Sequence, residues 1–161
     1  MENRKKKWIA LATSVAAAIV TYLLVSNVMD FMRREQKKES QPTPTIEELV
    51  GNLQSQLPIV QKFEHSVVTQ TGVDVRNDSL ILSFRIKAED AVLDAFRDPE
   101  RASVLREGGL KGMIDDYKSN RLMQMACDQG LVIAHKYYDE GGKPICSLDY
   151  SPDDYRPFLG Q

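Results

Sequence analysis

The chain has 161 residues, which leaves room for one domain of ordinary size. Its 42% hydrophobic and 27% charged residues are typical of a globular protein and exclude a wholly disordered one. The net charge of −2 is unevenly spread: residues 1–39 hold eight Lys/Arg and four Asp/Glu, and residues 40–161 hold thirteen and nineteen. This acidic second part excludes nucleic acid as a favoured partner, because phosphate binding needs clustered basic side chains.

The first predicted element is a membrane anchor at residues 8–30, preceded by a basic tail at residues 1–7. The run WIALATSVAAAIVTYLLVSNVM carries no charge, and as a helix it would span roughly 33 Å, enough to cross a bilayer core. The alternative is a signal peptide cleaved near the alanines at 16–18. The apolar run continues well beyond that site, which favours an anchor that is retained.

The orientation of this anchor follows from its basic flanks. Four Lys/Arg precede it and four follow it, so the count alone is tied. The cluster at residues 4–7 emerges first and directly adjoins the span, which predicts a cytoplasmic N-terminus. In a bacterium the chain would then be a single-pass protein of the inner membrane, with the bilayer as one partner and its C-terminal domain in the periplasm.

A polar linker at residues 31–44 leads to a domain predicted at residues 45–161. Thr45 and Glu48 form the sequence pattern of a capping box, and apolar residues recur behind them at helical spacing, which predicts a first helix that ends before Pro58. Two alternating strands follow at 65–75 and 79–87, separated by the turn residues Asn77 and Asp78.

A helical region comes next and a second hairpin closes the chain. We predict helices at 89–97 and from Asp98 to a stop at Gly108-Gly109, and then a longest helix at 110–129. Strands are predicted at 131–138 and 143–150, joined by a glycine-containing turn. The predicted fold class is α+β, with element order α-ββ-αα-ββ and an antiparallel sheet behind the single transmembrane helix.

The closing hairpin resembles that of a loosely defined group of small bacterial envelope proteins with an N-terminal anchor. The residues that carry this resemblance are Gly130, Tyr137, Tyr138, Asp139, Gly142 and Lys143. The resemblance implies a location in the cell envelope and brings no activity with it. In that group a helix cysteine and a cysteine after the last strand are suited to a disulfide, but this chain has Lys118 and Tyr155 near those places.

Cys127 and Cys146 are the only two cysteines, and two interpretations stay open. They could form a disulfide in an oxidising periplasm, or they could be small buried apolar side chains. The two histidines, His65 and His135, do not combine with them at the spacing of a zinc site, so we predict no metal and no other cofactor. The carboxylate pairs 115–116 and 153–154 are interpreted as solvated surface charge.

Aromatic residues concentrate in the closing hairpin and tail, where they favour either an interface or a core. The candidate interface residues are Tyr137, Tyr138, Tyr150, Tyr155 and Phe158. The sequence therefore predicts a non-enzymatic binding or assembly module that acts on another membrane or periplasmic protein. One alternative is a membrane-tethered inhibitor or immunity-type protein, and another is a small hydrolase or redox enzyme that uses Cys127 or His135.

Overall fold

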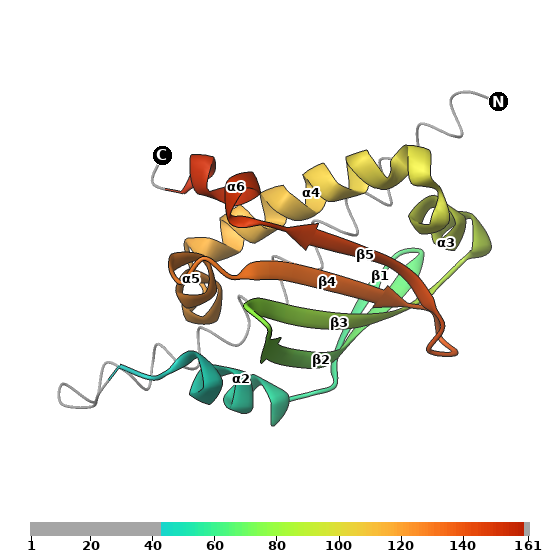
Figure 1. The fold of residues 1–161 in the computed structure, drawn as a ribbon. Helices are drawn as coiled ribbons and strands as arrows, with labels where there is room; N and C mark the ends of the chain where they lie inside the picture. Colours follow the sequence, from blue (N-terminus) through green and yellow to red (C-terminus); the bar gives the residue numbers. More distant parts are fainter. Residues whose placement is uncertain (1–42, 160–161) are drawn as a thin grey trace.

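The computed structural model describes residues 43–159, in which helices pack against a five-stranded sheet (Figure 1). The strands are β1 (Ile59–Phe63), β2 (Ser66–Arg76), β3 (Ser79–Ala88), β4 (Val132–Tyr138) and β5 (Pro144–Tyr150). The helices are α2 (Ile46–Gln54), α3 (Asp90–Arg97), α4 (Pro99–Tyr117), α5 (Arg121–Asp128) and α6 (Pro152–Tyr155), with the 3-10 turn η1 (Arg156–Phe158). The predicted α+β class is confirmed.

The predicted basic tail, anchor and nearly all of the linker lie outside the described residues. Between residues 43 and 159 no helix combines the length and the apolar character needed to cross a bilayer.

The start of α2 is the predicted capping box. The Thr45 side chain accepts a hydrogen bond from the Glu48 backbone N–H at 3.2 Å, and the Glu48 carboxylate accepts one from the Thr45 N–H at 2.8 Å. Two donors that the helix leaves unpaired are therefore satisfied reciprocally. The predicted apolar stripe is buried, and its members are Ile46, Leu49, Val50 and Leu53.

Both predicted hairpins are present. In the first, β2 and β3 are joined by Asn77 and Asp78, whose φ angles of 49° and 56° are the positive values that a tight hairpin turn requires. In the second, β4 pairs antiparallel with β5. The sequence missed β1, a five-residue strand that pairs antiparallel with β2. Its sequence, IVQKF, is short and sits directly behind Pro58, so it has too little alternation to be distinguished from a loop.

The antiparallel sheet was the wrong prediction, because the sheet is mixed. Its order is β1-β2-β3-β4-β5, and β3 pairs with β4 in parallel, with Leu82 opposite His135. The element order is therefore α-βββ-ααα-ββ followed by α6, and not α-ββ-αα-ββ. Three helices separate the two hairpins and return the chain to the end of the sheet where β3 began, which makes the next strand parallel.

The predicted helix break at Gly108-Gly109 was also wrong. Helix α4 runs through both glycines and ends at Tyr117, and Asn120 then starts α5 by accepting a hydrogen bond from the Met123 N–H at 3.0 Å. The glycines are buried, and a Cβ at Gly109 would overlap the hydroxyl of Tyr150 on β5. Glycine at this position allows a close approach of helix and sheet, so it does not mark a helix end.

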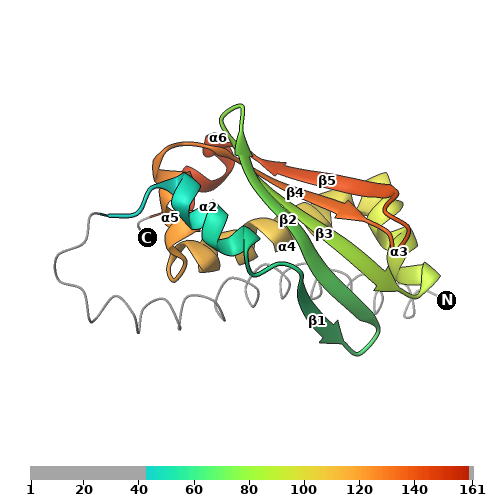
Figure 2. The same cartoon turned by 90° about the horizontal axis from the view of Figure 1, so that it is seen from below.

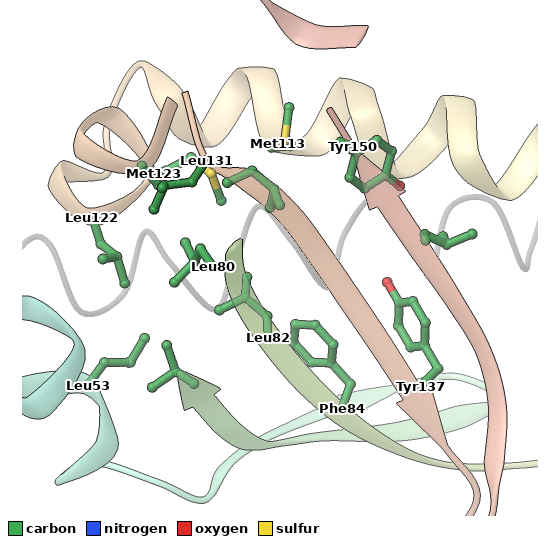
Figure 3. Close-up of a cluster of buried hydrophobic side chains, with 14 of the residues drawn as sticks. Leu53, Leu80, Leu82, Phe84, Met113, Leu122, Met123, Leu131, Tyr137 and Tyr150 are labelled. Carbon is green, nitrogen blue, oxygen red and sulfur yellow. The ribbon is translucent and has the colours of Figure 1, made fainter. Parts of the chain in front are cut away.

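The hydrophobic core lies between the sheet and the helices on one of its faces. On β3 every second residue from Leu80 to Ile86 is at most 2% exposed. These residues meet Met113 of α4, Leu122 and Met123 of α5 and Leu53 of α2 in one cluster (Figure 3). Helices α2, α4 and α5 lie on the same side of the strands (Figure 2). We call this side the covered face.

Candidate functional site

The opposite side of the sheet, which we call the open face, carries the alternate residues of the same strands. Because side chains alternate along a strand, the neighbours of the buried β3 residues point away from the helices. Strand register then assigns the matching positions on the other strands. The central residues of the open face are Val60, Lys62, Val67, Thr69, Ile81, Ser83, Arg85, Lys87, Lys136 and Tyr138. None of these ten residues is fully buried, and Val60 is 54% exposed, whereas the small side chain of Ala134, which register places between Ile81 and Asp149 on the same face, is 6% exposed.

Basic side chains gather on the part of the open face near the β4–β5 turn. Arg85, Lys62 and Lys136 form no ion pair with any described residue, whereas Lys87 binds Glu140 with an N–O distance of 2.8 Å. Arg85 stands opposite Tyr138 in the β3–β4 register. This region is basic although the second part of the chain is acidic, so the charges are segregated in space.

The other end of the open face carries acidic groups. Asp74 pairs with Arg76 on β2, and Asp149 on β5 accepts a hydrogen bond from the Ser147 hydroxyl at 2.7 Å. The open face therefore has a basic end with one aromatic side chain and a mixed end with two carboxylates, of which Asp74 is paired with an arginine.

The five aromatic candidates divide into two groups. Tyr137, Tyr150 and Tyr155 have no exposed surface, and the Tyr155 hydroxyl donates to the Leu131 carbonyl oxygen at 2.9 Å, so for these three the core interpretation applies. Tyr138 is half-buried on the open face, and Phe158 at the C-terminal end is 47% exposed. Tyr138 alone of the five lies on the open face.

The two residues named for an enzyme lie in the interior. His135 has no exposed surface and contacts the rings of Phe84 and Tyr150 edge-on, with centroids 5.8 Å and 5.3 Å away. Burial lowers the pKa of His135 to about 4, which leaves the ring neutral at pH 7. Burial, with Asp128 nearby, raises the pKa of Cys127 to about 12. A nucleophilic thiolate needs the opposite shift, so neither residue has the environment that catalysis would use.

Cys127 and Cys146 are both free. Cys127 lies near the start of β4, where the Leu131 N–H bonds the Ala126 carbonyl at 2.9 Å, whereas Cys146 stands opposite Tyr137 near the end of that strand. At ~3.3 Å per residue these points are roughly 20 Å apart, and a disulfide needs Cα atoms within about 7 Å. This placement favours the interpretation of two separate, largely buried apolar side chains.

His65 is half-exposed, and its ring nitrogens lie 3.7 Å from a Glu89 carboxylate oxygen and 3.8 Å from one of Glu64. Within residues 43–159 no three His, Cys, Asp or Glu side chains converge on a point where a metal ion could bind.

The carboxylate pairs are not simply solvated, as the sequence suggested. Asp116 has no exposed surface, and its side chain has no hydrogen-bond partner among the residues that the structure describes. Burial, with a smaller effect of Asp115, raises its pKa to about 9. It is therefore a neutral acid at pH 7. Its place in the apolar stripe of α4 was hidden by the polar residue type, and its spacing from Met113 was the one signal that pointed to it.

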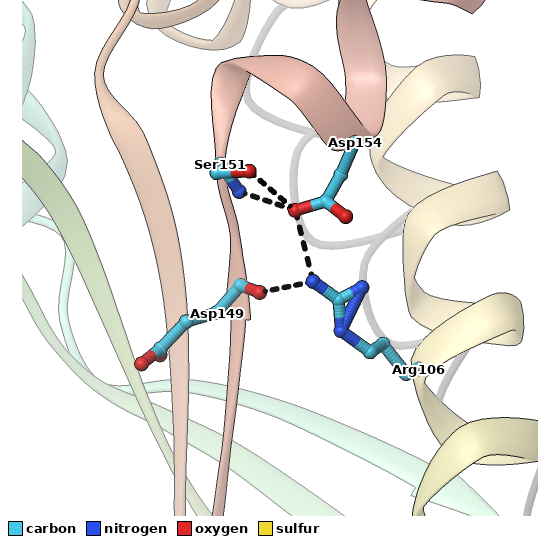
Figure 4. Close-up of polar contacts among 4 residues, drawn as sticks. All are labelled: Arg106, Asp149, Ser151 and Asp154. Atoms are coloured by element: carbon cyan, nitrogen blue, oxygen red, sulfur yellow. Dashed lines mark hydrogen bonds and ion pairs between the residues drawn. The ribbon is translucent and has the colours of Figure 1, made fainter.

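Asp154 belongs to a polar contact that fastens the C-terminal end (Figure 4). Its carboxylate accepts hydrogen bonds from the Ser151 N–H and hydroxyl, both at 2.7 Å, and from Arg106 of α4 at 2.9 Å. Arg106 also donates to the carbonyl oxygen of Asp149 at 2.8 Å, on the outer edge of β5. Hydrogen bonds from Ser151, with the Arg106 charge, lower the pKa of Asp154. This contact joins α4, β5 and α6.

The basic residues of the open face were missed by the sequence analysis. Alternation along β3 does mark Ser83, Arg85 and Lys87 as outward-pointing. The sequence does not say whether another element covers that outward face, and Lys136 lies on a strand whose parallel partner was not predicted. Sheet topology brings these residues together.

Comparison with known proteins gives a likeness of fold. No family model matches the chain, and no curated protein matches its sequence. A crystal structure of a protein from Pseudomonas aeruginosa described as secreted aligns with a TM-score of 0.54 at 13% identity, over 69% of this chain and 89% of that one.

Two pilotins of type II secretion systems also align. EpsS from Vibrio vulnificus has a TM-score of 0.43 at 14% identity, over 68% of this chain and 86% of its own. AspS from Vibrio cholerae has a TM-score of 0.43 at 15% identity, over 68% and 91%. These two scores are below what a shared fold requires. This chain therefore shares its fold with the Pseudomonas protein, and the likeness extends to the fold alone.

Proposed function

We propose that the chain is a membrane-anchored, non-enzymatic binding or assembly module that contacts another protein of the bacterial envelope through the open face of its sheet. The observation that carries this proposal is the open face itself. Five strands present one face to the core and leave the other without a covering element in residues 43–159. That face combines basic groups that form no ion pair in the same range with Tyr138, a residue type favoured as an interface anchor.

The predicted anchor supports the location. An uncharged run of 22 residues followed by a polar linker would hold the domain close to the bilayer. A tethered domain meets other membrane proteins at a high effective concentration, so a modest contact area suffices for function. The burial of His135 and Cys127 favours this function over the enzyme alternative.

The test is site-specific photocrosslinking of the full-length protein in its native membrane. A photoreactive phenylalanine analogue is placed at Tyr138 on the open face and, as the matched control, at Val104, which is 36% exposed on α4. We expect position 138 and not position 104 to give an adduct with an envelope protein, identified by mass spectrometry.

Two outcomes would reject this function. One is a set of adducts from position 138 that contains only copies of the chain itself. The other is an identical set of adducts from positions 138 and 104, because contacts made by both sides of the domain reflect crowding at the membrane.

A further inference from the structure

Three basic residues of β3 and β4 form a track across the open face. Lys87 and Arg85 are alternate residues of β3, so their Cα atoms are about 7 Å apart. Lys136 lies on β4 two positions before Tyr138, the residue opposite Arg85, so it is a diagonal neighbour at about 7–8 Å. We call Lys87, Arg85 and Lys136 the basic track. Its charges repeat at steps of about 7 Å on a rigid, hydrogen-bonded surface.

The charge of the track is only partly neutralised. Arg85 and Lys136 have no acidic partner among residues 43–159, and Lys87 shares its charge with Glu140 of the β4–β5 turn. Elsewhere in the same range several basic residues are paired, as Arg76 is with Asp74 and Arg106 with Asp154. The track is therefore the part of the open face where an incoming carboxylate is attracted most strongly.

An extended polypeptide has the same repeat. Residues at i and i+2 point to the same side and lie about 7 Å apart, so carboxylates at every second residue would meet successive groups of the track. We infer that the basic track binds an extended acidic segment of the envelope partner, with Asp or Glu at alternate positions. This inference rests on the proposed function and names the chemistry of the partner at the same face.

The distribution of acidic residues favours a protein segment over an anionic lipid surface. Asp74 and Asp149 lie on the same face as the track, and Glu140 stands at its end. Asp74 and Glu140 are paired with Arg76 and Lys87, but Asp149 forms no ion pair within residues 43–159 and would repel a planar layer of anionic headgroups brought against the whole face. An extended segment can follow the track and leave Asp74 and Asp149 untouched.

Glu140 gives the track an internal competitor. Its carboxylate forms an ion pair with Lys87. Both side chains are more than 60% exposed, so the pair is weak and another carboxylate can displace Glu140 from Lys87. To bind Lys87, an acidic segment must first break the Lys87–Glu140 ion pair. Glu140→Gln removes the competitor, and we expect it to tighten binding.

The experiment uses the full-length protein in nanodiscs of zwitterionic lipid and two fluorescent peptides of equal composition. In one peptide Glu alternates with Thr, and in the other the glutamates form one block. We expect the alternating peptide to bind several-fold more tightly, and higher salt to weaken it.

The decisive variant is Arg85→Glu with Lys136→Glu. Its matched control is Lys111→Glu with Arg121→Glu, which makes the same change of charge at exposed positions of α4 and α5. We expect the track variant to lose about tenfold or more in affinity for the alternating peptide, while the control loses no more than about twofold. Glu140→Gln is expected to gain about twofold. Circular dichroism confirms that each variant is folded.

The inference is overturned if both double variants weaken binding equally, if the two peptides bind alike, or if Glu140→Gln weakens binding. It is also overturned if the track variant loses binding to phosphatidylglycerol vesicles while peptide binding stays unchanged, since that result assigns the track to lipid. These outcomes are separate from the proposed function. If the adduct from position 138 persists in the track variant, the open face still binds a protein, but not through an acidic segment.

Discussion

The two faces of this sheet are made by the same strands and have opposite character. On the covered face even polar side chains are buried, such as His135 and the hydroxyls of Tyr137 and Tyr150, which have no hydrogen-bond partner among residues 43–159. On the open face charged side chains stand in solvent, and three of the basic ones, Lys62, Arg85 and Lys136, form no ion pair within residues 43–159. Adjacent residues such as Phe84 and Arg85 therefore lie in different environments, one in the core and one in solvent. The covered face maintains the fold, and the open face is available for recognition.

The strongest test of this division compares those two neighbours. Phe84 is 2% exposed and stacks on Tyr137 with ring centroids 5.4 Å apart. Phe84→Ala should lower the free energy of unfolding by ~3–5 kcal/mol, because it leaves a cavity in the core. Arg85→Ala should change it by less than ~0.5 kcal/mol. Urea unfolding of both variants measures the contrast. Similar losses for the two would mean that the open face also contributes to stability.

The next largest effect is expected where helix and sheet approach most closely. A Cβ at Gly109 would overlap the Tyr150 hydroxyl and lie 3.2 Å from its Cζ. Gly109→Ala should therefore destabilise by ~2 kcal/mol, despite the better helix propensity of alanine. Adding Tyr150→Phe removes the hydroxyl and should restore part of the loss. If the double variant is no more stable than Gly109→Ala alone, the close contact is not the cause.

The buried Asp116 predicts an unusual pH dependence. Its pKa is raised from 3.8 to about 9, so between these values the folded state holds a proton that the unfolded state releases. Stability should therefore fall as the pH rises through this window, by up to ~1.4 kcal/mol per pH unit. Asp116→Asn should flatten this slope in urea unfolding at several pH values. Asp115→Asn, which changes an exposed neighbour, should retain it, and a slope that survives in Asp116→Asn would contradict the assignment.

The smallest effect is expected at the contact that fastens the C-terminal end. Arg106 is partly exposed, and it bonds Asp154 and the Asp149 carbonyl while lying 5.3 Å from the centre of the Tyr150 ring. Arg106→Ala should lower the free energy of unfolding by ~1 kcal/mol. The partly exposed ion pair contributes little by itself, and the hydrogen bond to the backbone and the contact with the Tyr150 ring add to its contribution. Arg101→Ala breaks a local pair with Asp98 and should cost less than ~0.5 kcal/mol. Thermal unfolding of the two variants measures this difference in stability. Equal losses of stability would mean that the Arg106 contact contributes no more than an ordinary surface ion pair.

The parts of the fold that could be predicted are those whose signals are local. The capping box at Thr45 and the turn at Asn77 and Asp78 need only a few adjacent residues, and both are present. The parallel pairing of β3 with β4 depends on the path of three helices, which no short window reveals. Gly109 was wrongly predicted to end a helix, because sequence alone cannot distinguish a glycine that ends a helix from one that allows a side chain of another element, here Tyr150, to pack closely.

The same limit applies to the candidate site. Tyr138 was among the predicted interface residues and lies on the open face, whereas Tyr137 beside it is in the core. Which member of this pair points outward depends on the side that the helices cover, and the sequence does not show that side. Arg85 and Lys136 are 51 residues apart in the sequence, so they come close together only after the sheet has formed.

Arg106 has one more consequence, for the edges of the sheet. By bonding the Asp149 carbonyl on the outer side of β5, it obstructs one of the two places where a further strand could be added. Within residues 43–159, β1 is left as the edge where strand addition is unobstructed. Two molecules that joined there would use both of their accessible edges at once. Such a contact closes as a pair and cannot propagate into a fibril.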